Sequence, residues 1–208
     1  MDGRDVVIVS ALRTPFDRFG GPMRYLHSIE LGAEVIKRIL KRVDLPGSAV
    51  DMVYYGTCMP AETALECNIP GRQALLKAGL PPETLSVTID RACCSSLTGI
   101  IFGYQGIRAG FYDVVLVVGS ENMMNAPLLA RKARWGSRLG HMILEDPLFE
   151  LGYKGEFNPV SVDAGEVALE YGVTREDQDA WAYRSQMRYQ EAFRQGKFKD
   201  EIVPLEIP

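Results

Sequence analysis

The segment IDRACCSSLTGI, Ile89 to Ile100, places two adjacent cysteines where a short apolar run is followed by a helix-like pattern. A cysteine attacks as its thiolate, and a helix N-terminus lowers the pKa of a nearby thiol because its unpaired N–H groups and dipole stabilise the anion. Cys93 lies at this turn, and open α/β sheets bind their ligands at the carboxyl ends of parallel strands. We therefore treat Cys93 as a hypothetical nucleophile, although cysteines in such turns are more often inert packing groups.

The other cysteines and the histidines carry weaker signals. Cys94 points in a different direction from its neighbour, so both thiols cannot face one pocket, and a small core residue is the simpler interpretation. Cys58 and Cys67 flank a loop and have no stronger signal. His27 and His141 lie outside any metal-ligand spacing and no CxxC occurs, so we expect no metal site.

Composition excludes several classes of protein. The 208 residues carry a formal net charge of −4, which argues against a general nucleic-acid binder. No apolar run approaches the roughly 20 residues that span a membrane. The first residues, MDGRDVVIVSALRTP, lack an apolar core of signal length, so we expect a cytoplasmic protein with reduced cysteines.

The first 120 residues alternate strand and helix patterns. The predicted strands are 5–11, 51–58, 85–90 and 112–121, and the predicted helices are 28–43, 71–80 and one that starts at Ser95. Ser28 is the expected N-cap of the first helix. This alternation predicts an α/β fold with a mostly parallel, mixed sheet that helices cover on both faces.

The pattern changes after Glu121. Residues 122–161 are irregular and rich in Gly, Pro, Met and Arg, and so long a connection is usually functional or has substructure of its own. Two helices follow, near 164–171 and from Thr174 to about Gln195, and residues 200–208 resemble a strand. We expect two parts, residues 1–121 and 122–208.

Several segments together resemble the thiolase family. TIDRACCSSLTGI is similar to its nucleophile segment, VVIVSALRTPFDRFGG to its opening strand and loop, and NIPGRQALLKAGLP to its second helix. VVGSENMMNAP resembles the fourth strand, and YGVTREDQDAWAYRSQMRYQEAFRQGKFKDEIVPLEI the helical part of the loop domain. The resemblance implies a thiolase-like N-terminal βαβαβαβ domain in residues 1–121, lacking its last strand, and part of an inserted loop domain for substrate binding and oligomerisation in residues 122–208.

The resemblance also implies a reaction. A thiolase transfers an acyl group between its nucleophilic cysteine and coenzyme A, cleaving a 3-ketoacyl-CoA such as acetoacetyl-CoA or running the reverse Claisen condensation. Matching outward from RAC assigns the nucleophile to Cys93, whose backbone N–H would contribute to an oxyanion hole. Coenzyme A is then a substrate, and no permanently bound cofactor is expected.

The rest of the family's catalytic set has no match here. Its base histidine, its second catalytic cysteine and a further histidine belong to the C-terminal half, and neither His27 nor His141 lies in a matching context. Without the last strand and the C-terminal half, this chain would leave one sheet edge unpaired and an apolar face uncovered, and both features promote aggregation. We therefore expect a separate partner chain that carries the last strand and the C-terminal domain, in a hetero-oligomer that is at least a heterotetramer.

The expected contacts to coenzyme A are less specific. Pro159, Val160 and Ser161 align where the family often has His-Met-Gly beside the pantetheine, and Ser96 and Asp90 replace a usual glycine and asparagine. A run of basic residues could hold the 3′-phosphoadenosine of coenzyme A or line the pocket entrance, and a solvated loop is an equally good interpretation. It consists of Arg131, Lys132, Arg134 and Arg138.

Two other functions remain open at this point. A ketoacyl-synthase-like condensing enzyme also fits DRACCSSL and selects the same Cys93, but the opening segment and VTREDQDAWAYRSQ favour a thiolase. A non-catalytic scaffold subunit would keep the fold without the chemistry. A reactive Cys93 thiol at neutral pH separates the enzyme from the scaffold.

Overall fold

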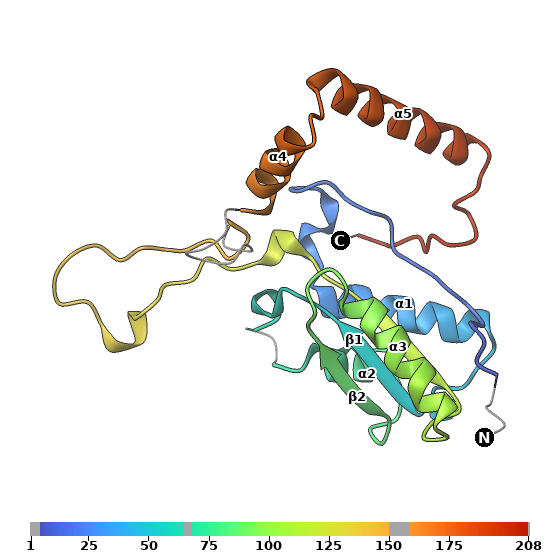
Figure 1. Cartoon of the computed structure of the whole chain (residues 1–208). Coiled ribbons are helices and arrows are strands. Elements are labelled where there is room, and N and C mark those ends of the chain that lie inside the picture. The colour runs from blue at the N-terminus through green and yellow to red at the C-terminus, as the bar shows by residue number, and fades with distance from the viewer. Residues whose placement is uncertain (1–4, 65–67, 150–158, 208) are drawn as a thin grey trace. The chain divides into compact units, whose positions relative to one another are not determined.

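A parallel three-stranded sheet is the centre of the computed structural model, which describes residues 5–64, 68–149 and 159–207 (Figure 1). Its strands are β1 (Met52–Gly56), β2 (Leu85–Ile89) and β3 (Val115–Gly119), in the order β2-β1-β3. Gly56 pairs with both Ile89 and Gly119, so the three strands end together at one edge of the sheet. All five residues of β1 are buried, as its continuous apolar run predicts for a central strand.

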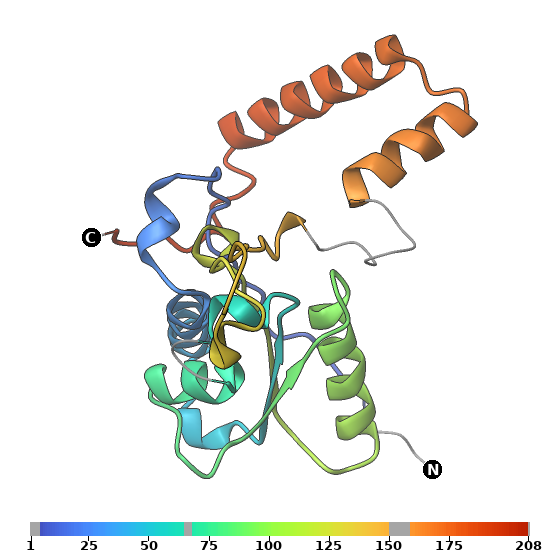
Figure 2. The same cartoon turned by 90° about the vertical axis from the view of Figure 1, so that its left-hand side faces the viewer.

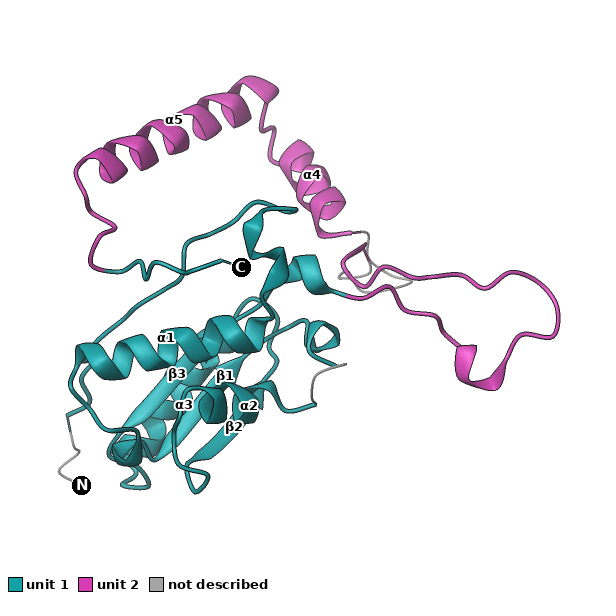
Figure 3. Cartoon of the chain, turned by 180° about the vertical axis from the view of Figure 1, so that it is seen from behind, with its two compact units in different colours: residues 1–126, 201–208 teal, residues 127–200 magenta. Residues whose placement is uncertain are grey.

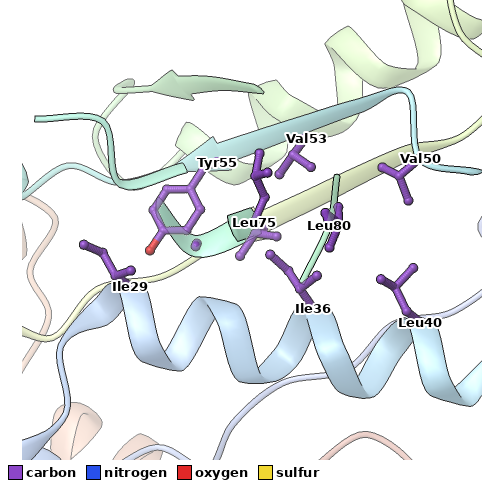
Figure 4. Close-up of a cluster of buried hydrophobic side chains, with 10 residues drawn as sticks. Ile29, Ile36, Leu40, Val50, Val53, Tyr55, Leu75 and Leu80 are labelled. Atoms are coloured by element: carbon purple, nitrogen blue, oxygen red, sulfur yellow. The ribbon is translucent and has the colours of Figure 1, made fainter. Parts of the chain in front are cut away.

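Helices cover both faces of the sheet, which confirms the predicted α/β fold (Figure 2). The helices α1 (Ser28–Arg42) and α2 (Pro70–Lys77) pack on one face, where Val53 and Tyr55 of β1 point. Figure 4 shows this cluster, which consists of Ile29, Ile36, Leu40, Val50, Val53, Tyr55, Ala74, Leu75, Leu80 and Val118. The alternate residues of β1, Met52 and Tyr54, face α3 (Ser95–Arg108) on the other side.

The helix α3 packs on the sheet through its smallest residues. Gly99, Gly103 and Gly106 are buried, and a Cβ added to Gly99 would lie 2.9 Å from Cγ1 of Val117. The large apolar residues of α3 lie on its other side and are exposed. The helix therefore has a close-packed face of small residues and an uncovered face of large ones.

Two predicted strands are not strands in the structure. Residues 5–10 have no strand partner among the described residues, and Val7, Ile8 and Val9 are exposed. The segment near the C-terminus forms only an isolated bridge, in which Ile202 pairs with Arg13. These two predictions were wrong because a strand is defined by hydrogen bonds to a neighbouring strand, which an apolar run alone does not supply.

The start of α1 also differs from the prediction. His27, rather than Ser28, is the N-cap, and its backbone N–H donates to Glu30 Oε2 at 3.1 Å. Ser28 lies one residue further on and is buried, and its backbone N–H and hydroxyl both donate to the carboxylate of Glu62. The Ser28 hydroxyl, which we expected to cap the helix, therefore binds the buried carboxylate of Glu62 instead.

The chain divides into two units, residues 1–126 with 201–208, and residues 127–200 (Figure 3). The second unit contains α4 (Val160–Glu170), which begins four residues before the predicted start, and α5 (Arg175–Arg194). Thr174 caps α5 as predicted, with its hydroxyl accepting from the backbone N–H of Asp177 at 3.1 Å. Short 3-10 helices complete the chain at Pro22–Tyr25, Gly47–Ala49, Pro60–Glu62, Met123–Asn125 and Ala133–Trp135.

Candidate functional site

Cys93 lies on a tight turn between β2 and α3. Ala92, directly before it, has a φ of 49°, which an L-residue with a Cβ adopts at a cost. Two side chains hold the turn. Asp90 Oδ1 accepts from the Ala92 N–H at 3.0 Å, and the Ser95 hydroxyl accepts from the Arg91 N–H at 2.8 Å while donating to the Ala92 carbonyl at 2.6 Å. The turn therefore presents an exposed Cys93 thiol directly before the first residues of α3.

Two glycines allow the N-terminus of α3 to lie close to the strand ends. A Cβ on Gly56, the last residue of β1, would lie 2.6 Å from the backbone nitrogen of Ser96. A Cβ on Gly119, the last residue of β3, would collide with the Ser96 hydroxyl. The helix start is thus held over the carboxyl ends of both strands, where its N–H groups favour an anion.

A pocket of about 580 Å³ opens at this edge of the sheet. Cys93 and Ser96 line it from the start of α3, and Thr57 and Cys58 line it from the end of β1. Further walls include the segment from Leu12 to Asp17, Leu31, Gly32 and Val35 of α1, and the residues that follow β3, Ser120 to Met124. Cys94 does not line this pocket, so the two adjacent thiols have different surroundings. The interpretation of Cys94 as a small core residue was wrong: it is exposed, because it is the N-cap of α3 and the buried face of the helix begins only at Ser95.

Glu121 organises the part of the pocket beside Cys58. Its Oε1 accepts from the backbone N–H groups of Cys58 at 2.5 Å and Met59 at 2.7 Å, and from the Thr57 hydroxyl at 3.2 Å. Its Oε2 accepts from the Cys58 thiol at 3.4 Å. Burial, followed by the hydrogen bond and the charge of Glu121, raises the pKa of Cys58 to about 12.

Sequence reasoning missed this pair. Cys58 and Glu121 are separated by 63 residues, and each looks like an ordinary residue just beyond a strand. The available signal was their common position, because parallel strands bring the residues after their carboxyl ends together. Cys67 lies outside the described residues.

Neither histidine of the chain lines the pocket that contains Cys93. His27 precedes α1, with its Nδ1 3.5 Å from Oε1 of the buried Glu62. His141 is exposed and belongs to the second unit. Among the described residues that line the pocket, the titratable groups are Arg13, Asp17, Cys58, Cys93 and Glu121, so no imidazole is present to activate Cys93.

The residues expected to contact coenzyme A all lie in the second unit, whereas Cys93 lies in the first. Arg131 is paired with Glu145, next to a two-hydrogen-bond bridge between Leu129 and Glu145. The remaining basic residues, Lys132, Arg134 and Arg138, are exposed. Val160, 65% exposed, and Ser161, also exposed, form the first turn of α4.

The part of the chain that the structure describes contains no group of three His, Cys, Asp or Glu residues placed to hold a metal ion. Within the same residues, no helix combines the length and apolar character needed to cross a membrane.

Comparison with known proteins decides the family. The family model described as thiolase, N-terminal domain, matches residues 6–208. The chain belongs to the thiolase family. The resemblance expected from RAC and its neighbouring segments is thereby confirmed, and the thiolase match extends over the second unit as well as the first.

Similar proteins are named as acetyl-CoA acetyltransferases, acetyl-CoA acyltransferases or thiolases. An acetyl-CoA acetyltransferase of Pseudomonas aeruginosa is 40% identical over 207 residues, which are 99% of this chain and 52% of that protein. A crystal structure of the Bacillus anthracis acetyl-CoA acetyltransferase superposes with a TM-score of 0.92 at 32% identity. A thiolase from Ascaris suum, solved in complex with coenzyme A, gives 0.89 at 33% identity. The two superpositions include 99% and 97% of this chain but only 52% of each solved structure. The chain therefore spans about half the length of the relatives it matches.

Proposed function

We propose that this chain is the nucleophile-bearing half of a thiolase, which transfers acyl groups to and from coenzyme A through an acyl-Cys93 intermediate in the cytoplasm. The observation that carries the proposal is the position of Cys93. It lies on a turn held by side-chain hydrogen bonds, in a pocket at the carboxyl ends of three parallel strands, and the chain belongs to the thiolase family. The names of its relatives support coenzyme A thioesters as substrates.

In the proposed reaction, the Cys93 thiolate attacks the 3-keto carbon of a 3-ketoacyl-CoA. The bond between C2 and C3 breaks, acetyl-CoA leaves after its α-carbon takes a proton, and the shortened acyl group stays on Cys93 as a thioester. A second coenzyme A thiolate then attacks this thioester and releases Cys93. The N–H groups at the start of α3 favour the thiolate in both half-reactions.

A complete reaction needs a base for Cys93, and the described residues that line the pocket include no imidazole to serve as one. We propose that a separate chain with the thiolase C-terminal half supplies this base, within a complex that is at least a heterotetramer. The relatives are about twice as long as this chain, which supports a missing complementary half. The exposed face of α3 supplies a surface for it.

That face is an apolar stripe with helical spacing. Leu97 is 56%, Ile101 42% and Tyr104 51% exposed, and Ile100 between them is 45% exposed. Residues three and four apart share one face of a helix. Burying this stripe under the partner would stabilise the complex by about 25 cal/mol for each Å² of apolar surface removed from water.

The decisive experiment is the native mass of the complex purified from its source, followed by the denaturing masses of its components. A second chain of comparable length in equal amount supports the proposal, and the pair should then cleave acetoacetyl-CoA when coenzyme A is added. A particle built only from this chain contradicts the two-chain enzyme. A single longer chain that contains this sequence contradicts the separate partner and leaves the thiolase activity to be assayed on that chain.

A non-catalytic scaffold is the second candidate, favoured by the lack of an imidazole beside Cys93. Alkylation of the isolated chain at neutral pH separates the two. A nucleophile reacts with iodoacetamide faster at Cys93 than at Cys58, and the matched variant Cys94→Ser leaves that difference unchanged. Equal rates at the two thiols support the scaffold.

A further inference from the structure

We propose that Cys58 is a resolving thiol for Cys93, which traps an oxidised Cys93 as a reversible Cys58–Cys93 disulfide. This goes beyond acyl transfer and rests only on one part of the proposed function, the reactivity of Cys93. It assigns a chemical role to a cysteine whose sequence context showed none, and it predicts a state in which the nucleophile is protected from irreversible oxidation.

Both thiols face the same pocket from neighbouring strands. β1 and β2 are hydrogen-bonded in parallel with Gly56 opposite Ile89, and the Thr57 N–H donates to the Ile89 carbonyl at 3.0 Å, so the pairing continues beyond Gly56. Cys58 follows directly, and the turn after Ile89 returns to place Cys93 in the lining of the same pocket. The two thiols thus enter one pocket from the ends of hydrogen-bonded strands, and a disulfide between them requires their Cα atoms to come within about 4.4–6.8 Å.

The two thiols are prepared for different steps. Cys93 is exposed beside a helix N-terminus, the setting in which a cysteine is oxidised first. Cys58 is half-buried, and its thiol donates to Glu121 Oε2 at 3.4 Å, which keeps the proton on sulfur. A smaller cause of the raised pKa of Cys58 is its electrostatic interaction with Cys93.

The chemistry needs a hydroperoxide as the oxidant. The Cys93 thiolate attacks one peroxide oxygen, the O–O bond breaks, and Cys93 becomes a sulfenic acid while the other oxygen leaves as water or an alcohol. The Cys58 sulfur then attacks the sulfenic sulfur of Cys93, the S–O bond breaks, and the hydroxyl leaves as water. The leaving hydroxyl takes the proton that the Cys58 thiol gives up, so no proton is left over. The peroxide is reduced by two electrons, and the two thiols supply them.

Cys94 and two variants of Cys58 provide the controls. Cys94 is next to Cys93 in sequence but outside the pocket, so a vicinal Cys93–Cys94 bond is the competing product. Replacing Cys58 by serine keeps a hydroxyl that can donate to Glu121, and Cys58→Ala provides a second variant in case the serine protein folds poorly. Circular dichroism checks that each variant is folded.

The test treats the reduced full chain with a several-fold excess of hydrogen peroxide, blocks free thiols with N-ethylmaleimide and identifies the products by peptide mass spectrometry. Wild type and Cys94→Ser should give a Cys58–Cys93 linked peptide, lighter than its parts by two hydrogens, which dithiothreitol reverses. Cys58→Ser and Cys58→Ala should give about tenfold more Cys93 sulfinic acid, which dithiothreitol does not reverse.

Two results overturn the proposal while leaving the acyl-transfer function intact: a Cys93–Cys94 disulfide in wild type, or equal amounts of Cys93 sulfinic acid in wild type and Cys58→Ser. A Cys93 that peroxide leaves unmodified, with coenzyme A thiolysis present in the complete enzyme, also overturns it. The same unmodified Cys93 without any thiolysis would count against the nucleophile assignment itself.

Discussion

Glu121 holds Cys58 from two sides, with its Oε2 3.4 Å from the thiol sulfur and its Oε1 2.5 Å from the Cys58 backbone nitrogen. One carboxylate thus fixes the backbone at the end of β1 and keeps a thiol protonated in the pocket that Cys93 also lines. The site therefore pairs an exposed thiol, suited to react, with a thiol whose proton is held in place.

Replacing Glu121 by glutamine should make Cys58 more reactive. The change removes the negative charge that raises the pKa of Cys58, while burial, the largest cause, remains. The glutamine Oε1 can still accept from the two backbone N–H groups. Each unit by which the thiol pKa falls increases the thiolate fraction about tenfold at pH 8.5, so we expect several-fold faster iodoacetamide labelling of Cys58.

The matched control for this variant is Glu34→Gln, on the exposed surface of α1, where Glu34 pairs with Arg38. It should leave the labelling rate of Cys58 unchanged. Labelling is followed residue by residue with peptide mass spectrometry. If Glu121→Gln and wild type label Cys58 at the same rate, Glu121 does not control this thiol.

The buried hydroxyl of Tyr55 should lower the free energy of unfolding at alkaline pH. It is fully buried, its hydroxyl donates to the Ser28 carbonyl at 3.1 Å, and burial raises its pKa from 10.0 to about 12. The folded chain therefore keeps a proton that the unfolded chain loses. This contribution is intact below about pH 10 and is lost progressively as the pH rises towards 12.

Tyr55→Phe should be less stable than wild type at pH 7, by about 1 kcal/mol, because it loses one hydrogen bond. Its free energy of unfolding should then fall less steeply above pH 10, so the two curves converge. Urea unfolding at several pH values measures this, with the exposed Tyr104→Phe on α3 as the control that follows wild type. Parallel curves for Tyr55→Phe and wild type would contradict the assignment.

Gly99→Ala tests the packing of α3 through its small face. The new Cβ would lie 2.9 Å from Val117 Cγ1 and 3.1 Å from Tyr54 Cβ, so the helix must move away from the sheet. We expect a loss of roughly 1–3 kcal/mol from overpacking, although alanine favours a helix by about 1 kcal/mol. Denaturant unfolding measures the change.

Gly165→Ala in α4 is the matched control, because nothing lies within 4 Å of its added Cβ. This variant should not destabilise its unit and should gain up to about 1 kcal/mol from helix propensity. If Gly99→Ala lowers the free energy of unfolding no more than Gly165→Ala does, the close packing of α3 on β3 does not limit the size of residue 99.

Periodicity in the sequence located most of the first unit. The apolar runs that became β1, β2 and β3 and the helical pattern after Ser95 gave clear periodic signals. In β1 all five residues are buried, which explains its continuous apolar run. Residues 5–11 are equally apolar, yet the strand predicted there does not form. Strand pairing depends on a neighbouring strand, and a local sequence pattern does not identify that neighbour. Val7 and Ile8 accordingly remain exposed.

The candidate site shows the same division. Cys93 could be selected from its own neighbours, because a thiol at a strand-to-helix turn has a local electrostatic reason to react. Cys58 could not, since its environment comes from Glu121, a distant residue that folding brings to the end of an adjacent strand. The strained Ala92 was equally invisible, because alanine gives no sign that its φ is 49°.

The exposed basic residues of the second unit lead to the last prediction, which depends on the proposed function. No carboxylate among the described residues is paired with Arg134 or Arg138, whereas Arg131 is already paired with Glu145. If they bind the 3′-phosphate of coenzyme A, Arg134→Gln and Arg138→Gln should each raise the KM for coenzyme A by about two- to fivefold, the range for an exposed charge pair. The kcat should change little, because the contact is the same in the ground and transition states.

Dephospho-coenzyme A supplies the internal control, since it lacks only the 3′-phosphate. The two variants should leave the KM for dephospho-coenzyme A at the wild-type value, so that the preference for coenzyme A shrinks. Lys41→Gln, in the last turn of α1 in the first unit, should alter neither KM. A loss that is equal for both substrates would mean that these arginines act on the fold of the second unit rather than on the phosphate, because only the phosphate distinguishes the two molecules.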